Sequence, residues 1–165
     1  MQLQSMYQEI ILDHYRDPHG RGLREPYDGE SFQVNPTCGD EVTLRVKLDG
    51  DTVADVSYEG LGCSISQASE SLLHDLVVGK SLSQAEAIGA DFLTLMQSRG
   101  DPAVAESLEE SLDDAVAFTG VGKYPARVKC ALLGWMAFRD ATARAGAQHP
   151  GQTGARTDDS GGSDE

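Results

Sequence analysis

The chain has 165 residues, enough for one domain with a hydrophobic core, and 39% of them are apolar, which favours a folded domain over a disordered chain. The net charge of −14 argues against nucleic acid and anionic membrane surfaces as partners, because both attract basic proteins. The same charge permits docking on a partner that carries a basic patch. No apolar run reaches membrane-spanning length, so we expect no association with a membrane.

The N-terminal sequence points to a reducing compartment, and this determines how the cysteines are interpreted. The first ten residues, MQLQSMYQEI, lack a basic segment followed by an apolar one, so we expect no secretory signal and a cytoplasmic protein. The chain holds three cysteines, an odd number. Disulfides are disfavoured in the cytosol, and metal binding or thiol chemistry becomes the better interpretation.

The first half of the chain predicts one helix and one hairpin. Apolar residues at helical spacing predict a helix over 3–16, followed by a loop rich in Gly and Pro that continues to residue 37. Strict alternation over 42–48 predicts a half-buried strand, and Asp49-Gly50 is a hairpin signal before a return strand over 52–58. The hairpin places Cys38 just before one strand and Cys63 just after the other, so we expect the two thiols to lie close together.

The second half predicts helices. One apolar face begins at Ile65 and the pattern stops at Gly79, and a capping box at 83–86 predicts the start of a helix that continues to about residue 97. Asp101 and Pro102 are typical of a helix start, and we expect an acidic helix over 102–118. Its acidic side chains predict a solvated face: Glu106, Glu109, Glu110, Asp113 and Asp114.

The end of the chain divides into a helix and a tail. Gly120-Val121-Gly122 predicts a break, and the last helix should begin near residue 125 and end at about 145. Residues 146–165 contain no large apolar side chain, so we predict a disordered, polar and acidic tail. The predicted organisation is therefore one domain over 1–145 and a tail over 146–165.

The three cysteines and one aspartate are candidate metal ligands. Zinc takes about four ligands in a tetrahedron, and thiolate and carboxylate groups both serve. Cys38-Gly39-Asp40 offers a sulfur and an oxygen from one tight loop, and Cys63 lies where a helix dipole favours thiolate. Cys130 falls in the second turn of the last predicted helix. Taken singly, each cysteine is equally well explained as a small buried apolar residue, and the long spacing is not that of a zinc finger.

The four histidines fit ordinary roles better than ligand roles. His14 and His74 fall on predicted helices and His149 in the tail, so we expect surface or capping positions for them. His19 follows Pro18 in a loop, where it is free to approach a site, although nothing in the pattern requires it.

Four segments carry a resemblance to a known family. The stretches YQEIILDHYRDPHGRG, NPTCGD, YEGLGCSISQASESLLHDLVVGK and YPARVKCALLGW resemble, in the same order, motifs of the U-type iron–sulfur assembly proteins. Scaffold proteins of this family carry a His immediately before the third cysteine, where this chain has Lys129. The segment 89–118 fits the insertion that marks the SufU-type branch, so the chain resembles that branch.

This resemblance implies an α+β fold with a small antiparallel sheet packed against helices. It implies a zinc ion held by Cys38, Asp40, Cys63 and Cys130, with Cys38 as the residue that accepts sulfur as a persulfide. Arg127 matches a family arginine near the metal, where it would steady the released thiolate or pair with Asp40. The implied partners are a PLP-dependent cysteine desulfurase of the SufS type and a downstream iron–sulfur scaffold complex.

The implied function is that of a zinc-dependent sulfurtransferase that carries persulfide sulfur for iron–sulfur cluster assembly. Two alternatives remain open. The same ligands can hold a transient iron–sulfur cluster, as in a scaffold, although Lys129 supplies no ligand there. A zinc-stabilised interaction module without sulfur chemistry is the other. Because zinc shields a bound thiolate, we hypothesise that a donor from the desulfurase replaces Cys38 on the metal.

Overall fold

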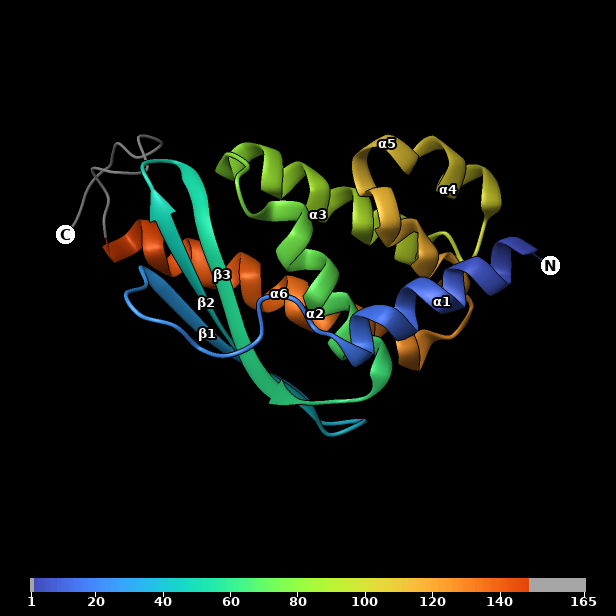
Figure 1. Cartoon of the computed structure of the whole chain (residues 1–165), viewed down its shortest axis with the longest axis horizontal. Coiled ribbons are helices and arrows are strands. Elements are labelled where there is room, and N and C mark those ends of the chain that lie inside the picture. The colour runs from blue at the N-terminus through green and yellow to red at the C-terminus, as the bar shows by residue number, and fades with distance from the viewer. Residues whose placement is uncertain (1, 149–165) are drawn as a thin grey trace.

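The computed structural model describes residues 2–148 as a three-stranded sheet with helices packed against one of its faces (Figure 1). This arrangement confirms the predicted α+β class, with a small antiparallel sheet packed against helices. The predicted tail from residue 149 onward lies outside the described residues. The elements in chain order are α1 (Gln2–Arg16), β1 (Gly29–Asn35), β2 (Asp40–Asp49), β3 (Thr52–Leu61), α2 (Ser64–Val77), α3 (Leu82–Gln97), α4 (Pro102–Ser107), α5 (Glu109–Leu112), a 3₁₀ segment η1 (Asp113–Lys123) and α6 (Pro125–Gln148).

The sheet is an antiparallel meander in the order β1-β2-β3. The predicted hairpin of β2 and β3 is confirmed, and the alternating apolar side chains of β2 are buried on one face: Val42, Leu44, Val46 and Leu48. Side chains at the intervening positions are half-buried. The sheet therefore contributes one apolar face to the core, which is what a period of two residues dictates.

The first strand was expected to be part of a loop, and that prediction is wrong for 29–35. In β1 the apolar Phe32 and Val34 face solvent, whereas the small or polar Gly29, Ser31 and Asn35 are buried. The usual apolar pattern is thus inverted, and the strand gives no apolar inner face to recognise. Ser31 pairs instead with α6, donating a hydrogen bond from Oγ to a carboxylate oxygen of Asp140 at 2.7 Å.

The last helix crosses behind the sheet (Figure 1) and continues to residue 148, three residues beyond its predicted end. Small residues on the buried face of α6, among them Ala137, Ala141 and Ala145, let the helix lie close to β1. A Cβ on Gly29 would collide with the backbone oxygen of Ala141, so this contact requires glycine. Within residues 2–148, no helix, including this 24-residue one, is long and apolar enough to cross a membrane.

Helices α2 and α3 occupy the predicted regions, but the cap of α3 lies earlier than expected. Ser81 is the N-cap residue, with an extended backbone and a capping box formed with Gln84. The predicted box at 83–86 is wrong because Ser83 already lies inside the helix, where it has no orphan amide to cap.

The acidic segment is not the single helix predicted over 102–118. It breaks into α4, α5 and η1, and Asp113 adopts a positive φ of 48° at the last junction. Five consecutive residues, 115–119, are buried, which a regular surface helix with one apolar stripe cannot achieve. The expected break at 120–122 falls inside η1. The acidic side chains predicted to be solvated are exposed, as expected.

Candidate metal and sulfur site

A tight turn at one end of the sheet carries two of the predicted site residues. β1 ends at Asn35 and β2 begins at Asp40, and these two residues pair across the turn. Cys38 lies at the exposed tip, whereas Asp40 is only 3% exposed. Gly39 between them has a φ of +76°, a conformation that other residues rarely adopt. The turn therefore places one accessible thiol beside one buried carboxyl group.

The neighbouring strand delivers Cys63 to the same place. Leu61, at the end of β3, pairs with Glu41, so the chain passes beside Asp40 before α2 begins. Cys63 is the N-cap residue of α2 and its side chain caps no backbone amide. Its thiol lies 3.8 Å from Oδ2 of Asp40. A Cβ at Gly62 would collide with Oγ of Ser66, so any other residue here would require the Ser66 side chain to rotate.

The third cysteine comes from the second turn of α6, as predicted. Cys130 is buried, and its Sγ lies 3.3 Å from Sγ of Cys38. Ligand atoms of Cys38, Asp40 and Cys130 all lie within 4.8 Å of one another. Cys63 stands just outside this triad, beside Asp40. Three elements that are far apart in sequence thus converge on one group of sulfur and oxygen atoms.

The electrostatics of this cluster suit a cation. Burial raises the pKa of the Cys130 thiol, and the neighbouring Asp40, Cys38 and Cys63 raise it further. In the part of the chain that the structure describes, no salt bridge involves Asp40. A divalent ion would let these thiols lose their protons and would neutralise the carboxylate. The donor set of three sulfurs and one carboxylate fits Zn²⁺.

Asn35 also belongs to the site, although the sequence did not predict a role for it. Its side-chain amide donates a hydrogen bond to Sγ of Cys38 at 3.0 Å, and its Oδ1 accepts one from the amide of Thr37 at 3.2 Å. The side chain therefore fixes the turn and supports negative charge on the sulfur. Its signal in the sequence was the Asn-Pro turn pair directly before Cys38.

Glu70 is a second missed residue. It lies in the middle of α2 and is only 4% exposed. Burial raises its pKa to about 8, with the charge of Asp40 adding to the effect and Arg21 opposing it. Gly134 makes room for it, because a Cβ there would lie 2.7 Å from Cγ of Glu70. A single Glu on a helix gives no sequence signal of burial, since most such residues face solvent.

Arg127 and Lys129 both lie exposed near the start of α6. Among the described residues, no salt bridge joins Arg127 to Asp40. Arg127 instead lines a groove of ≈ 820 Å³ together with residues such as Tyr7, Ile65 and Tyr124. Ser64 and Ile65 also line the groove, so it runs beside the first turn of α2, which follows Cys63.

The histidines lie away from the cysteine cluster, and the surface role expected for His14 is wrong. His14 is 8% exposed and its Nδ1 is hydrogen-bonded to Oγ of Ser71 at 2.6 Å. His19 is exposed and His74 is half-buried; both contact Asp75. His149 lies outside the described residues.

Comparison with known proteins identifies the family. Residues 6–131 match the family described as the NifU-like N terminal domain. The chain is 39% identical to the zinc-dependent sulfurtransferase SufU of Bacillus subtilis, covering 86% of this chain and 92% of that protein. It is 40% identical to the iron–sulfur cluster assembly scaffold protein IscU of Streptococcus pyogenes, covering 89% of each.

Solved structures agree with this result. A SufU protein from Fervidobacterium islandicum superposes with a TM-score of 0.69 at 34% identity, covering 81% of this chain and 93% of that one. A NifU-like N-terminal structure from Brucella abortus shares the fold, with a TM-score of 0.77 at 22% identity and coverage of 90% and 99%. The chain therefore belongs to the NifU-like N-terminal domain family, as a SufU-type member of the U-type iron–sulfur cluster assembly proteins.

Proposed function

We propose that this member of the NifU-like N-terminal domain family is a zinc-dependent sulfurtransferase, which accepts persulfide sulfur from a cysteine desulfurase. The observation that carries the proposal is the contrast between exposed Cys38 and the buried Asp40 and Cys130 around it. One thiol can meet a partner while the others remain in place. The relative from Bacillus subtilis, which is named a zinc-dependent sulfurtransferase, supports the same activity.

Four side chains would hold the metal: Cys38, Asp40, Cys63 and Cys130. Bound zinc supplies one kind of chemistry here, which is to keep coordinated thiols deprotonated near neutral pH. Asp40, Cys63 and Cys130 lie on or directly beside regular elements, so the sheet, α2 and α6 fix their positions. Cys38 lies on the turn, with Gly39 beside it, and is the ligand best placed to depart.

The transfer step is a thiol–persulfide exchange. The Cys38 thiolate attacks the outer sulfur of the persulfide on the desulfurase cysteine and forms a new sulfur–sulfur bond. The bond between the two desulfurase sulfurs breaks, and its inner sulfur leaves as a thiolate. Cys38 then carries the persulfide with its proton, so atoms and electrons balance. We infer that Arg127, which is exposed near the start of α6, meets the departing negative charge or the partner.

The surface around Cys38 suits docking of a protein. Val34 and Leu61 flank Glu41 on the open face of the sheet, since both residues pair with it. The side chains of Val34 and Leu61 are 50% and 68% exposed, and Phe32 is also exposed further along β1. Exposed apolar side chains grouped beside a reactive group are typical of an interaction site. We therefore infer that the desulfurase covers this end of the sheet and reaches Cys38 there.

We place this activity in the cytoplasm, with an iron–sulfur scaffold complex as the downstream acceptor of the sulfur. A reducing compartment keeps three free thiols available, and a carried persulfide needs a second protein to consume it.

A scaffold role is the second candidate, because a relative at 40% identity is named a cluster assembly scaffold. A scaffold holds the cluster itself on these ligands. Exposed Lys129, directly before Cys130, supplies no ligand at neutral pH. Reconstitution with iron and sulfide separates the two roles: a stable brown protein favours the scaffold, and a colourless protein with one zinc favours the carrier.

The function is tested by desulfurase turnover. We expect zinc-loaded protein to raise alanine production by a cysteine desulfurase, and Cys38→Ala to abolish this effect. Val34→Asp should weaken the stimulation while leaving the zinc content unchanged, because it alters only the inferred docking face. Leu93→Asp, which makes the same kind of change at an exposed apolar residue of α3, is the matched control. Stimulation that persists in Cys38→Ala, or that needs no zinc, contradicts the proposal.

A further inference from the structure

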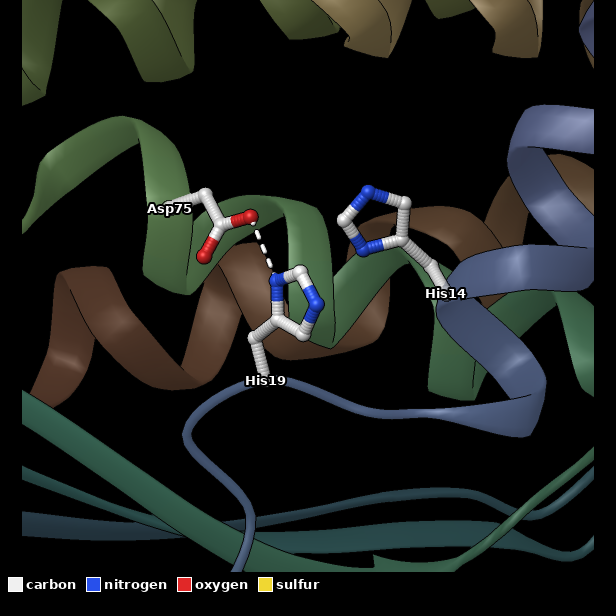
Figure 2. Close-up of side chains that lie close together, drawn as sticks. All are labelled: His14, His19 and Asp75. Atoms are coloured by element: carbon white, nitrogen blue, oxygen red, sulfur yellow. Dashed lines mark hydrogen bonds and ion pairs between the residues drawn. The ribbon is translucent and has the colours of Figure 1, made fainter.

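A second group of metal-binding side chains lies away from the cysteines, where α1 meets α2. His14 comes from α1, His19 from the loop that follows it and Asp75 from the last turn of α2 (Figure 2). One ligand atom of each residue lies within 4.8 Å of the other two. The two imidazole rings are tilted by 58° with centroids 4.8 Å apart. Side chains from three segments therefore converge on one point.

The cluster is anchored from several sides. Oγ of Ser71 contacts Nδ1 of His14 at 2.6 Å and accepts a hydrogen bond from the backbone amide of His19 at 2.8 Å. The hydroxyl of Tyr58 donates to the backbone oxygen of His19 at 2.8 Å. These contacts hold both histidines without using the carboxylate. Such supporting hydrogen bonds are what orient ligands in metal sites.

The two oxygens of Asp75 are engaged differently. Oδ1 lies 3.0 Å from Nδ1 of His74, whereas Oδ2 lies 2.6 Å from Nδ1 of His19. His74 thus fixes the carboxylate and leaves Oδ2 facing the histidine pair. His74 itself packs on Gly20, where a Cβ would collide with its ring. The carboxylate is therefore aimed at the histidines by a side chain outside the cluster.

We propose that His14, His19 and Asp75 form a second binding site for a divalent transition-metal ion. Two imidazoles and one carboxylate are a ligand set that zinc and ferrous iron both accept. Three protein ligands leave a coordination position open for water, which distinguishes this site from a closed structural one. The inference does not depend on the proposed sulfur transfer, because none of these residues belongs to the cysteine cluster.

The required movement is small and lies in exposed side chains. In the structure Nδ1 of His19 and Oδ2 of Asp75 lie 2.6 Å apart, which is a hydrogen-bond distance. Two ligands that share one zinc at tetrahedral angles lie ~3.3 Å apart, so the pair must separate by less than an ångström. The side chains of both residues are more than a third exposed, so neither is locked by packing.

The two sites lie at opposite ends of α2. Cys63 occupies the N-cap position of α2 and Asp75 belongs to its last turn, a separation of about 18 Å along the helix axis at 1.5 Å per residue. An ion at one site therefore cannot share ligands with the other. Metal at the second site would link α1, its following loop and α2, three segments that are otherwise joined by hydrogen bonds.

The test uses cobalt as a spectroscopic probe on the full chain, already loaded with one equivalent of zinc. We expect a second equivalent of Co²⁺ to bind and to show ligand-field bands without sulfur-to-cobalt charge transfer. Asp75→Asn and His19→Gln should each weaken this second equivalent at least about tenfold. Both positions are exposed, and a single cooperative thermal unfolding transition of each zinc-loaded variant checks that it folds. Asp51→Asn, at the exposed β2–β3 turn, and His149→Gln are matched controls that should bind as the wild type does.

Two outcomes would overturn the proposal. The first is a titration in which zinc-loaded wild-type protein binds no second cobalt ion. The second is a second equivalent that binds with unchanged affinity in both Asp75→Asn and His19→Gln, because that ion would then lie elsewhere.

Discussion

The two ends of α2 present two clusters built on different principles. At the Cys63 end, a sheet turn and two helix starts bring together sulfur atoms and a buried carboxyl group. At the Asp75 end, a helix, a loop and a helix terminus bring together imidazoles and an exposed carboxylate (Figure 2). Soft thiolates bind zinc tightly, whereas imidazole and carboxylate form a weaker and more exchangeable site. Under the two proposals, one helix serves two metal chemistries because its two ends meet different partner segments.

Two acidic residues of α2 also differ between its two halves, because their pKa values are shifted in opposite directions. Burial raises the pKa of Glu70 to about 8, and nearby Asp40 adds to the effect. Burial acts in the same direction on Asp75, but hydrogen bonds from His74 and His19 outweigh it and lower the pKa of that carboxyl. One acid retains its proton near neutral pH and the other loses it, although only five positions separate them.

The largest expected effect follows from removing one of the two less exposed thiols of the cysteine cluster, Cys63 or Cys130. Cys63→Ser and Cys130→Ser should lose zinc on purification and lose about 3 kcal/mol or more of stability, because structural metal binding is coupled to folding. This corresponds to a fall of about 10 °C in melting temperature for a domain of this size. Metal analysis and thermal unfolding monitored by circular dichroism provide the measurement.

The matched change at the other end is His19→Gln, which should retain the zinc of the cysteine cluster and shift stability by less than about 1 kcal/mol. Release of that zinc by His19→Gln would contradict the independence of the two ends of α2. A full equivalent of zinc in Cys63→Ser would contradict the role of Cys63 as a ligand.

The next effect concerns the pH dependence of metal-free protein. Because the folded state holds the Glu70 proton up to about pH 8 and the unfolded state releases it near 4.5, stability should fall as pH rises between these values. Glu70→Gln should remove this fall, with a difference of at most about 5 kcal/mol at pH 8. Urea unfolding of chelated protein at pH 5 and pH 8 measures it. Parallel pH profiles for the wild type and Glu70→Gln would show that Glu70 ionises freely.

The contribution of Asp75 to stability should change with pH in the opposite direction. The pKa of the Asp75 carboxyl is lower in the folded protein than in the unfolded chain. Its contribution to stability is therefore fully present above the unfolded-state pKa of about 3.8, and it is lost as the pH falls through the folded-state pKa. Asp75→Asn should therefore destabilise the protein near neutral pH and make no difference in strong acid. Unfolding at pH 7 and pH 2.5 checks this, and a destabilisation that persists undiminished at pH 2.5 would assign it to packing instead.

The smallest effect concerns the support of Cys38. Asn35→Ala removes the donor 3.0 Å from its sulfur, so the thiolate loses one hydrogen bond. In metal-free protein, alkylation of Cys38 at neutral pH should slow by about two- to tenfold, the kinetic equivalent of one such bond. Peptide mapping of the alkylated cysteines gives the rate at each position. Equal slowing at Cys130 would indicate general distortion of the site rather than loss of this contact.

The parts of the structure that sequence could predict are those where one pattern dominates. The alternation in β2 and the Asp-Gly turn after it specify the hairpin, and the Gly and Cys residues at its open end indicate where ligands gather. The predicted grouping of Cys38 with Asp40 follows from their being two residues apart on a tight turn. These features rest on local geometry, so sequence suffices for them.

The missed features depend on partners far away in sequence. β1 faces its polar residues inward because α6 offers Asp140 to Ser31, a contact across 109 residues. Glu70 is buried because Gly134 leaves space for it. His14 is buried because α1 packs on α2 beside Ser71. Each outcome is decided by tertiary packing that overrides the local preference, and no window of sequence contains both partners.

The most direct test of the proposed sulfur transfer is to find which cysteine carries the transferred sulfur. Zinc-loaded wild-type protein and Cys38→Ala are each incubated with a cysteine desulfurase and cysteine, and the peptides are mapped by mass spectrometry without reduction. We predict an added sulfur on Cys38 in the wild type, and no persulfide on the variant even where it keeps its zinc through Asp40, Cys63 and Cys130. An added sulfur on Cys63 or Cys130, together with full activity of Cys38→Ala, would contradict the assignment of Cys38 as the acceptor.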